Sequence, residues 1–476
     1  MRRAGAVRCL VVIAFAGALL CGAVPIGAGP DGPYLGYLVS AEDTGPEGAE
    51  LAARAVRAAG GRVVEEYREI GVVLAYSGAP DFGARLRGAR GIAAAGADRT
   101  AAVAAEPAAH AADAAAPTRA EGVDDTGIPL VPDPHERPSW NLAMVGARPA
   151  PPAPPSALSH VVVAVLDAGV DDTDPDLRAA VDPARSASCA GGVPDASPGA
   201  WRPDPAIPES GHGTHVAGMI AAARNGDGVV GIAPGARIAA VRLLGPEGQY
   251  YGENLVCGFL WAADHGARVI NNSYFADPWK YNCPGDPDQR AIITAVGRAV
   301  GYAERRGALV VASAGNDGQD LDAPRTDDRS PNDHPAGSAP LNRTLGPDCI
   351  RLPGGLPGVL DVSAVDRTGG LATYSNWGVR QIGVAGPGGD PDSGAAGAVV
   401  SDWPGGHYAA LAGTSMAAAG VSGVAAVYAA LHPRADSSVL RALVERGAAA
   451  IDCPARSERL CPGAAYYGAG EVRLPR

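Results

Sequence analysis

Residues 160–169 read His-Val-Val-Val-Ala-Val-Leu-Asp-Ala-Gly, a β-branched apolar run that ends in an aspartate. Uninterrupted apolar strands of this kind are typical of parallel sheets, which are buried on both faces. Similar runs follow at 238–243, 269–271, 308–312 and 358–365, and helix-like segments such as 214–224 and 288–305 lie between them. The pattern predicts an α/β fold, a mostly parallel sheet with helices on both faces. We expect its ligand site at the carboxyl ends of the strands.

A smaller unit precedes this core. Residues 34–39, 62–67 and 71–76 read as short strands, and residues 48–59 form an Ala-rich helix pattern that stops at Gly60-Gly61. These features predict a small α+β domain over residues 32–100. Residues 101–155 are rich in Ala and Pro without a sustained period, which indicates an exposed linker. We expect the main domain over residues 156–450 and a tail over residues 451–476.

The amino terminus and the overall charge indicate the compartment. Arg2, Arg3 and Arg8 precede an apolar run over residues 9–20 that is too short to cross a bilayer, which predicts a secretory signal peptide over residues 1–28. Lipid anchoring through Cys21 is the alternative. No later stretch reaches about 18 uninterrupted apolar residues, so we expect a secreted protein without membrane insertion. The 476-residue chain has a formal net charge of −12, which argues against nucleic acid as a partner.

Six cysteines remain after signal removal, and an even number suits disulfides in an oxidising compartment. They are Cys189, Cys257, Cys283, Cys349, Cys453 and Cys461. Six cysteines allow 15 pairings, and only Cys453 and Cys461 are close enough in sequence to suggest a pair. The Cys-x-x-Cys spacing of a structural zinc site is missing, so disulfides are favoured over metal ligation.

Three segments carry residues with catalytic chemistry. Asp167 ends the first apolar strand, His212 stands in Gly-His-Gly-Thr-His-Val-Ala-Gly, and Ser415 stands in Gly-Thr-Ser-Met-Ala-Ala at the start of a small-residue helix. Each has a plainer interpretation: a turn cap, a satisfied histidine and a helix cap. A zinc pair of His212 and His215 is disfavoured, because the glutamate of the His-Glu-x-x-His motif is missing. Together, however, Asp, His and Ser form the set of orienting acid, base and nucleophile.

On these motifs the chain from about residue 140 to 450 resembles the subtilisin-like serine peptidases, the subtilase family. The resemblance implies Ser415 as nucleophile, His212 as general base and Asp167 as the carboxylate that orients the imidazole. Residues 310–317 resemble the family segment whose asparagine forms the oxyanion hole, which implies that role for Asn316. A turn residue before Asp317-Gly318 is the plainer interpretation of Asn316.

The resemblance extends to substrate and propeptide. Residues 269–273 look like the strand that pairs with the substrate main chain, which puts Ser273, Tyr274 and Phe275 at the substrate-contacting edge. The 32–100 unit is similar to the family's inhibitory propeptide. The implied protein is a secreted, monomeric serine endopeptidase made as a self-processed zymogen. Its partners are protein or peptide substrates and its own propeptide, which acts as an intramolecular inhibitor.

No cofactor or metal is required for this chemistry, although the family often carries structural calcium. Calcium could bind an acidic cluster, for which a solvated loop is the plainer interpretation. The cluster is Asp171, Asp172, Asp174 and Asp176.

The sequence departs from the family pattern at three positions. Ala168 replaces a hydroxyl residue after the aspartate, Ala419 replaces a common proline, and Phe275 replaces glycine at the substrate edge. These changes leave one alternative open, a catalytically impaired scaffold that acts as an extracellular binding module. An α/β-hydrolase esterase is a poorer fit, because it requires Gly-x-Ser-x-Gly and a histidine after the serine.

Overall fold

The computed structural model describes residues 33–100, 139–147, 151–226, 228–331, 333–334, 339, 341–451 and 463–475. The predicted signal peptide, Cys21, most of the predicted linker, and the pair Cys453 and Cys461 lie outside the described residues.

The core is a seven-stranded sheet in the order β13-β12-β9-β8-β5-β7-β6, in which every neighbouring pair is parallel. The strands are β5 Val162–Asp167, β6 Ala187–Ser188, β7 Arg237–Arg242, β8 Val269–Asn272, β9 Leu309–Ser313, β12 Leu360–Val365 and β13 Ile382–Pro387. The sheet confirms the predicted α/β fold class. It arises because each apolar run is buried on both faces.

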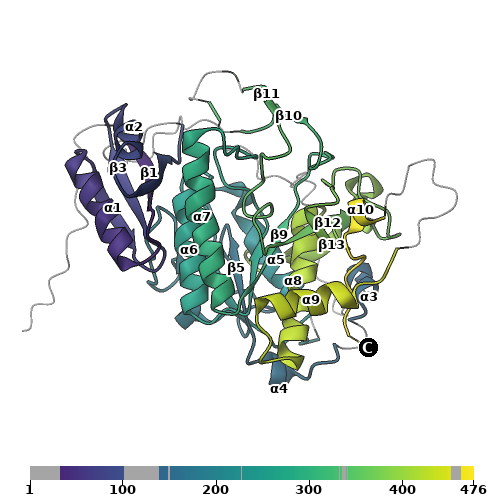
Figure 1. Ribbon diagram of the computed structural model, residues 1–476. Coiled ribbons are helices and arrows are strands. Elements are labelled where there is room, and N and C mark those ends of the chain that lie inside the picture. The colour runs from purple at the N-terminus through teal and green to yellow at the C-terminus, as the bar shows by residue number, and fades with distance from the viewer. Residues whose placement is uncertain are drawn as a thin grey trace, which may run out of the picture.

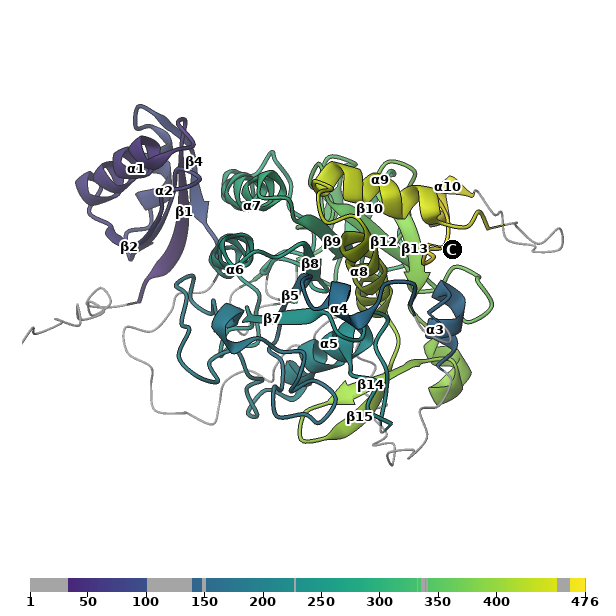
Figure 2. The same cartoon turned by 90° about the horizontal axis from the view of Figure 1, so that it is seen from below.

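Helices cover both faces of the sheet (Figure 2). On one face lie α5 His212–Ala221 and α8 Thr414–Leu431, and on the other lie α6 Gly252–Asp264 and α7 Pro287–Arg305. Side chains of β5 alternate between these layers: Val163 and Val165 join the α5/α8 cluster, whereas Val162 and Leu166 join the α6 and α7 cluster. Within the described residues, α8 alone has the length and apolar composition to cross a membrane, and 89% of it is buried in the core.

Shorter elements complete this domain. They are α3 Trp140–Val145, α4 Pro155–Leu158, η1 Pro183–Arg185, η2 Pro208–Gly211, β10 Arg325–Asp327, β11 Arg343–Leu345, η3 Pro391–Ala396, β14 Val399–Trp403, β15 His407–Leu411, α9 Ser437–Gly447 and α10 Ala464–Tyr467. The end of the expected tail is part of the fold, because Val472 is buried in the core and its N–H bonds the carbonyl of Ala385 at 2.9 Å. The start of the domain is anchored by Trp140, whose Nε1 donates to the carbonyl of Ala398 at 2.9 Å.

The amino-terminal unit is a separate α+β body with its own core (Figure 1). Its elements are β1 Leu35–Ala41, α1 Pro46–Ala58, β2 Arg62–Tyr67, β3 Val72–Ser77, α2 Phe82–Arg87 and β4 Ile92–Ala97. The strands form an antiparallel sheet in the order β2-β3-β1-β4. The predicted helix and three predicted strands lie where the sequence puts them, within two residues at each end.

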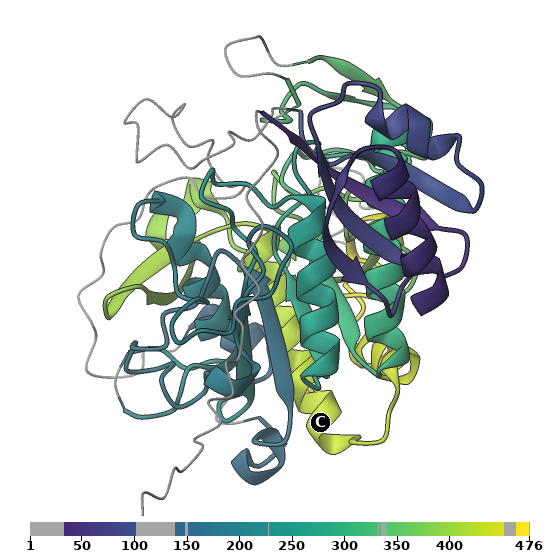
Figure 3. The same ribbon diagram turned by 90° about the vertical axis from the view of Figure 1, so that its left-hand side faces the viewer.

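This unit packs against α6 and α7 (Figure 3). Gly96 of β4 approaches the start of α7 so closely that a Cβ there would lie 2.5 Å from the Cα of Asp288, and the next N–H, of Ala97, donates to the Asp288 carboxylate at 3.1 Å. Arg298 of α7 donates to the carbonyl of Ala41 at 2.6 Å. The unit is therefore held by polar contacts as well as by apolar packing.

Two disulfides join segments of the main domain, Cys189 with Cys257 and Cys283 with Cys349. Their sequence separations are 68 and 66 residues. Spacing alone could not select these pairs, because the fold brings the distant partners together.

Candidate active site

Four of the residues singled out in the sequence lie at the carboxyl ends of the strands. Asp167 is the last residue of β5, His212 begins α5, Ser415 lies in the first turn of α8, and Asn316 follows β9. This is the edge where parallel α/β sheets hold their ligands. The sheet thereby brings together side chains that are up to 248 positions apart in the sequence, since Asp167 and Ser415 differ by 415 − 167.

Asp167 and His212 form a buried pair. Oδ1 of Asp167 lies 2.8 Å from Nδ1 of His212 and also accepts the N–H of Ala168 at 2.7 Å. The other oxygen, Oδ2, is buried without a hydrogen-bond partner among the described residues. Ala168 therefore supplies a backbone donor, but it lacks the hydroxyl that could serve the second oxygen.

The protonation of His212 depends on this carboxylate. Burial lowers the pKa of His212, but the negative charge of Asp167 and its hydrogen bond outweigh burial, so the pKa lies above the ordinary histidine value. A basic imidazole held by one nitrogen leaves the other available for proton transfer.

Ser415 lies beside the segment that follows β8. Its hydroxyl donates to the carbonyl of Ser273 at 3.1 Å, and the hydroxyl of Ser273 donates back to the carbonyl of Ser415 at 3.1 Å. Ser415 is at the helix start, where backbone N–H groups lack helical partners and negative charge is stabilised. Both Ser415 and His212 are only 2% exposed in this full-length chain.

Asn316 is oriented by Thr414, a residue for which the sequence suggested only helix capping. The backbone N–H and the hydroxyl of Thr414 both donate to Oδ1 of Asn316, at 3.0 and 2.8 Å. The same hydroxyl accepts the N–H of Gly315 at 3.1 Å. With its oxygen held in this way, the side-chain amide of Asn316 has a fixed orientation, and its Nδ2 carries two N–H donors.

Asn376 holds the backbone on both sides of Asn316, and it too was not among the site residues predicted from the sequence. Its Oδ1 accepts the N–H groups of Asp317 and Gln319, at 3.1 and 3.0 Å, and its Nδ2 donates to the carbonyl of Ala314 at 2.9 Å. Asn376 lies in the Tyr-Ser-Asn-Trp-Gly stretch at 374–378. An asparagine is suited to this task because it offers donors and acceptors together.

The predicted substrate-contacting residues differ in orientation. The hydroxyl of Tyr274 donates to Oδ1 of Asn272 at 2.6 Å, and its ring stacks on Tyr250 with centroids 4.9 Å apart, so this side chain serves the fold. Phe275 instead lies beside cations, with the guanidinium carbon of Arg351 5.1 Å from its ring centroid.

His215 does not join His212 in a metal pair. Its Nε2 lies 3.2 Å from the carbonyls of both Val399 and Ala409, and burial with the nearby His212 lowers the pKa of His215 to about 3. The neutral ring ties α5 to the β14–β15 hairpin.

The four aspartates of the 171–176 loop do not form a single cluster. Asp171 and Asp172 are engaged elsewhere, by Thr173 and by Arg202. The structure instead groups Asp174 and Asp176 with Asp402 of β14, with carboxylate oxygens within 4.8 Å of one another. Asp402 was not a candidate, because nothing local in the sequence links it to the other two.

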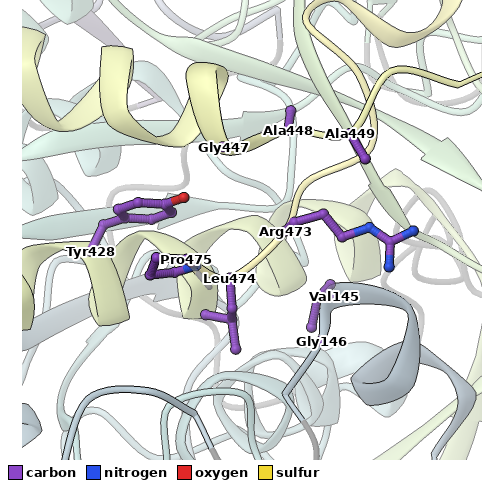
Figure 4. Close-up of a pocket in the computed structure, with 9 residues that line it drawn as sticks. All are labelled: Val145, Gly146, Tyr428, Gly447, Ala448, Ala449, Arg473, Leu474 and Pro475. Carbon is purple, nitrogen blue, oxygen red and sulfur yellow. The ribbon is translucent and has the colours of Figure 1, made fainter.

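A cavity of about 660 Å³ lies far from these groups (Figure 4). Its polar lining includes Tyr428 and Arg473, near the carboxyl ends of α8 and of the chain. Tyr428 is 13 residues beyond Ser415 on one helix, which places their Cα atoms about 20 Å apart. The cavity is therefore separate from the site around Ser415.

Comparison with known proteins agrees with this geometry. Fervidolysin of Fervidobacterium pennivorans is 33% identical over 312 residues, which are 61% of this chain and 37% of fervidolysin. Subtilisin Savinase of Lederbergia lenta is 34% identical over 269 residues, 56% of this chain and 76% of that protein. The chain thus spans little more than a third of the length of fervidolysin.

Solved structures share the fold. The epidermin leader peptide processing serine protease of Staphylococcus aureus superposes with a TM-score of 0.67 at 20% identity, over 92% of this chain and 96% of that one. Residues 159–464, well over half of the chain, match the Peptidase_S8 model of the subtilase family. By sequence and by fold, the chain belongs to the subtilase family.

Proposed function

We propose that this protein is a serine endopeptidase that hydrolyses peptide bonds through Ser415, His212 and Asp167. The contact of 2.8 Å between Asp167 and His212, at the sheet edge where α8 presents Ser415, carries the proposal. Membership of the subtilase family supports it. The chemistry requires no cofactor.

In the first step His212 removes the hydroxyl proton of Ser415, whose oxygen attacks the substrate carbonyl carbon. The carbonyl π electrons move to oxygen, forming a tetrahedral oxyanion. When the intermediate collapses, the C–N bond breaks and the imidazolium gives its proton to the leaving amine. Water then attacks the acyl-enzyme in the same way and releases the carboxylic acid and Ser415.

The oxyanion would be stabilised by Nδ2 of Asn316 and the backbone N–H of Ser415. Support comes from the two Thr414 hydrogen bonds, which fix the amide oxygen of Asn316 before substrate arrives. A donor that is oriented in advance loses little entropy as the negative charge develops. Ser273 and Phe275 would border the substrate main chain.

An impaired scaffold that serves as an extracellular binding module is the second candidate, favoured by the unpaired Oδ2 of Asp167 beside Ala168. We rank it lower, because the hydrogen bond to His212 is made by the other oxygen, Oδ1, and is intact. Leaving one buried carboxylate oxygen without a hydrogen bond costs about 1–3 kcal/mol. A loss of this size in the free energy that holds Asp167 in place slows an enzyme without abolishing its reaction.

The unit at residues 33–100 would act as an inhibitory propeptide that the enzyme removes by cutting within residues 101–133. Its packing on α6 and α7 supports this role. A tethered inhibitor acts at an effective concentration in the millimolar range, so a modest affinity would block the site until the tether is cut.

We also propose that the protein is secreted, with a signal peptide at residues 1–28, and acts as a monomer. The two disulfides support an oxidising compartment.

A structural calcium ion would be held by Asp174, Asp176 and Asp402. Asp402 is 0% exposed, and both of its oxygens lack a hydrogen-bond partner among the described residues, as does Oδ2 of Asp174. Such carboxylates are costly to bury, and oxygen ligands suit Ca²⁺. The ion would contribute to stability only.

A serine-reactive fluorophosphonate probe tests the function. The secreted wild type should be labelled and should cleave casein, and its amino-terminal sequence should begin within residues 102–133. Ser415→Ala should be unlabelled and should keep residues 33–100. Labelling of Ser415→Ala would contradict the assignment of the nucleophile, and identical trimming of both proteins in a peptidase-deficient host would contradict self-processing.

A further inference from the structure

Arg351 is held directly behind the segment that carries Asn316. The backbones of Asn282 and Ile350 exchange two hydrogen bonds, of 2.7 and 2.9 Å, and the disulfide between Cys283 and Cys349 lies beside them. Arg351 follows at once, and a Cβ built on Gly315 would lie 3.1 Å from its Nε. These two hydrogen bonds and the disulfide therefore hold the backbone at Arg351 in place relative to the site.

Arg351 also reaches the substrate edge. Its guanidinium carbon lies 5.1 Å from the centroid of the Phe275 ring. Phe275 is two residues beyond Ser273, whose carbonyl accepts the Ser415 hydroxyl, and two residues span at most about 7 Å. Phe275 and Arg351 therefore lie within reach of the substrate residue whose carbonyl Ser415 would attack.

Arg351 shares its surroundings with Lys280 and Asp317. Asp317, directly after Asn316, has a side chain that is 2% exposed, and its two oxygens bond Lys280 Nζ and the Tyr281 hydroxyl, each at 3.0 Å. Burial opposes ionisation of Asp317, but the charges of Lys280 and Arg351 hold its pKa below the ordinary value. Arg351 and Lys280 thus both act on Asp317.

Asp361 also interacts with Arg351. Burial raises the pKa of Asp361 to about 7, although Arg351 acts in the opposite direction. Asp361 is thus only partly ionised near neutral pH. Arg351 itself is 3% exposed, so a carboxylate that meets it does so in a medium of low dielectric, where charge-assisted hydrogen bonds are strong.

We infer that Arg351 is a specificity-determining residue that selects an acidic side chain, Asp or Glu, on the amino side of the cleaved bond. A basic side chain there would meet the positive charges of Arg351 and Lys280, while the carboxylate of Asp317 already bonds Lys280 and Tyr281. The inference rests on the proposed peptidase function and names the substrate class that the site accepts.

The test uses the processed, secreted enzyme and four internally quenched peptides that differ only in the residue before the cleaved bond: Glu, Gln, Leu or Lys. Wild type should cleave the Glu peptide with kcat/KM about 10- to 100-fold above the Gln peptide. Arg351→Met should bring the two within about threefold. Arg329→Met is the matched control, because Arg329 lies 3.9 Å from Asp317 but is 65% exposed, and it should keep the wild-type ratio.

Arg351→Glu separates a change of specificity from a folding defect. This variant should prefer the Lys peptide over the Glu peptide, a reversal that unfolding cannot produce. Equal wild-type cleavage of the Glu and Gln peptides, or a preference for Lys, would overturn the inference while leaving the peptidase intact. A wild-type protein that cleaves no peptide and does not react with fluorophosphonate would instead overturn the proposed function.

Discussion

Replacing Thr414 by valine should lower turnover without weakening substrate binding. Valine keeps the shape of threonine but removes the hydroxyl that donates to Asn316 at 2.8 Å and accepts from Gly315 at 3.1 Å. The backbone N–H of Thr414 still holds Asn316 at 3.0 Å. One of the two hydrogen bonds that orient Asn316, the proposed oxyanion donor, is therefore lost.

The loss of one hydrogen bond sets the size of the expected fall in kcat. A single hydrogen bond contributes about 0.5–1.5 kcal/mol net, and each 1.36 kcal/mol of barrier is tenfold in rate. We expect kcat to fall about 2- to 12-fold with KM nearly constant, because an oriented Asn316 acts mainly on the charge of the transition state. Steady-state kinetics on a peptide substrate measures both, and Thr414→Ser, which keeps the hydroxyl, is the control.

A double-mutant cycle sharpens the test. Asn316→Ala alone should reduce kcat by about 10²–10³, the loss known for such a donor in subtilisin, a member of this family. Adding Thr414→Val to Asn316→Ala should then cost little more, because the residue it orients is gone. Additive losses, or a rise in KM at unchanged kcat for Thr414→Val, would refute the positioning role.

Two further predictions concern the same site, and a third concerns the acidic cluster of Asp174, Asp176 and Asp402. Ser415→Ala and His212→Ala should each remove nearly all peptidase activity, and the double variant should match either single one, because the two act as one unit; clear additivity in casein assays would contradict this. Because the Asp167 charge raises the pKa of His212, the acid limb of the kcat/KM profile should be centred above about 6.5, and a midpoint below about 6 would contradict it. Removing calcium with EDTA at pH 7 should lower the Tm by about 5–10 °C, the stabilisation expected when free calcium is about 100 times its Kd. The Tm of Asp402→Asn should not respond to EDTA, whereas Asp195→Asn, at an exposed position, should behave as wild type. A wild-type Tm that does not respond to EDTA would contradict the calcium site.

The stability of the calcium-free protein should also depend on pH. Burial, and the charges of Asp174 and Asp176, raise the pKa of Asp402 well above its ordinary value. A carboxyl with a raised folded-state pKa stabilises the fold below its unfolded pKa of about 4, and that contribution is lost as the pH rises toward the folded pKa. The effect of EDTA on Tm should therefore be small near pH 4 and grow toward neutrality.

The sequence predicts those parts of the fold that have strong local patterns. Helix α7 was expected over residues 288–305 and spans Pro287–Arg305, because its apolar residues repeat at helical spacing and Asp286 caps it. Helix α5 was expected over residues 214–224 but spans His212–Ala221, because the chain turns away at Ala222 into a loop that bonds Asp176 through Val229. That ending depends on a residue far away in sequence.

Residues that act through distant partners could not be predicted in the same way. Thr414 has the local signal of a helix cap, and its partner Asn316 lies 98 positions away. Asp402 joins Asp174 and Asp176 only after β14 packs beside α5. Val472 and Leu474 are isolated apolar residues in a short segment, so their burial follows from contacts with β13 and α3 that no local period indicates.

The segment from Ala314 to Gln319 would couple the proposed role of Asn316 to the proposed specificity of Arg351. It is held on one side by Thr414, next to the nucleophile, and on another by Asn376, which bonds both Ala314 and Gln319. Arg351 packs against the same segment at Gly315, where a φ of +102° and the lack of a side chain permit close approach. A substrate side chain that draws Arg351 toward itself therefore acts on the backbone that positions Asn316. An acidic side chain should accordingly raise kcat as well as lower KM, whereas a contact serving only binding would change KM alone.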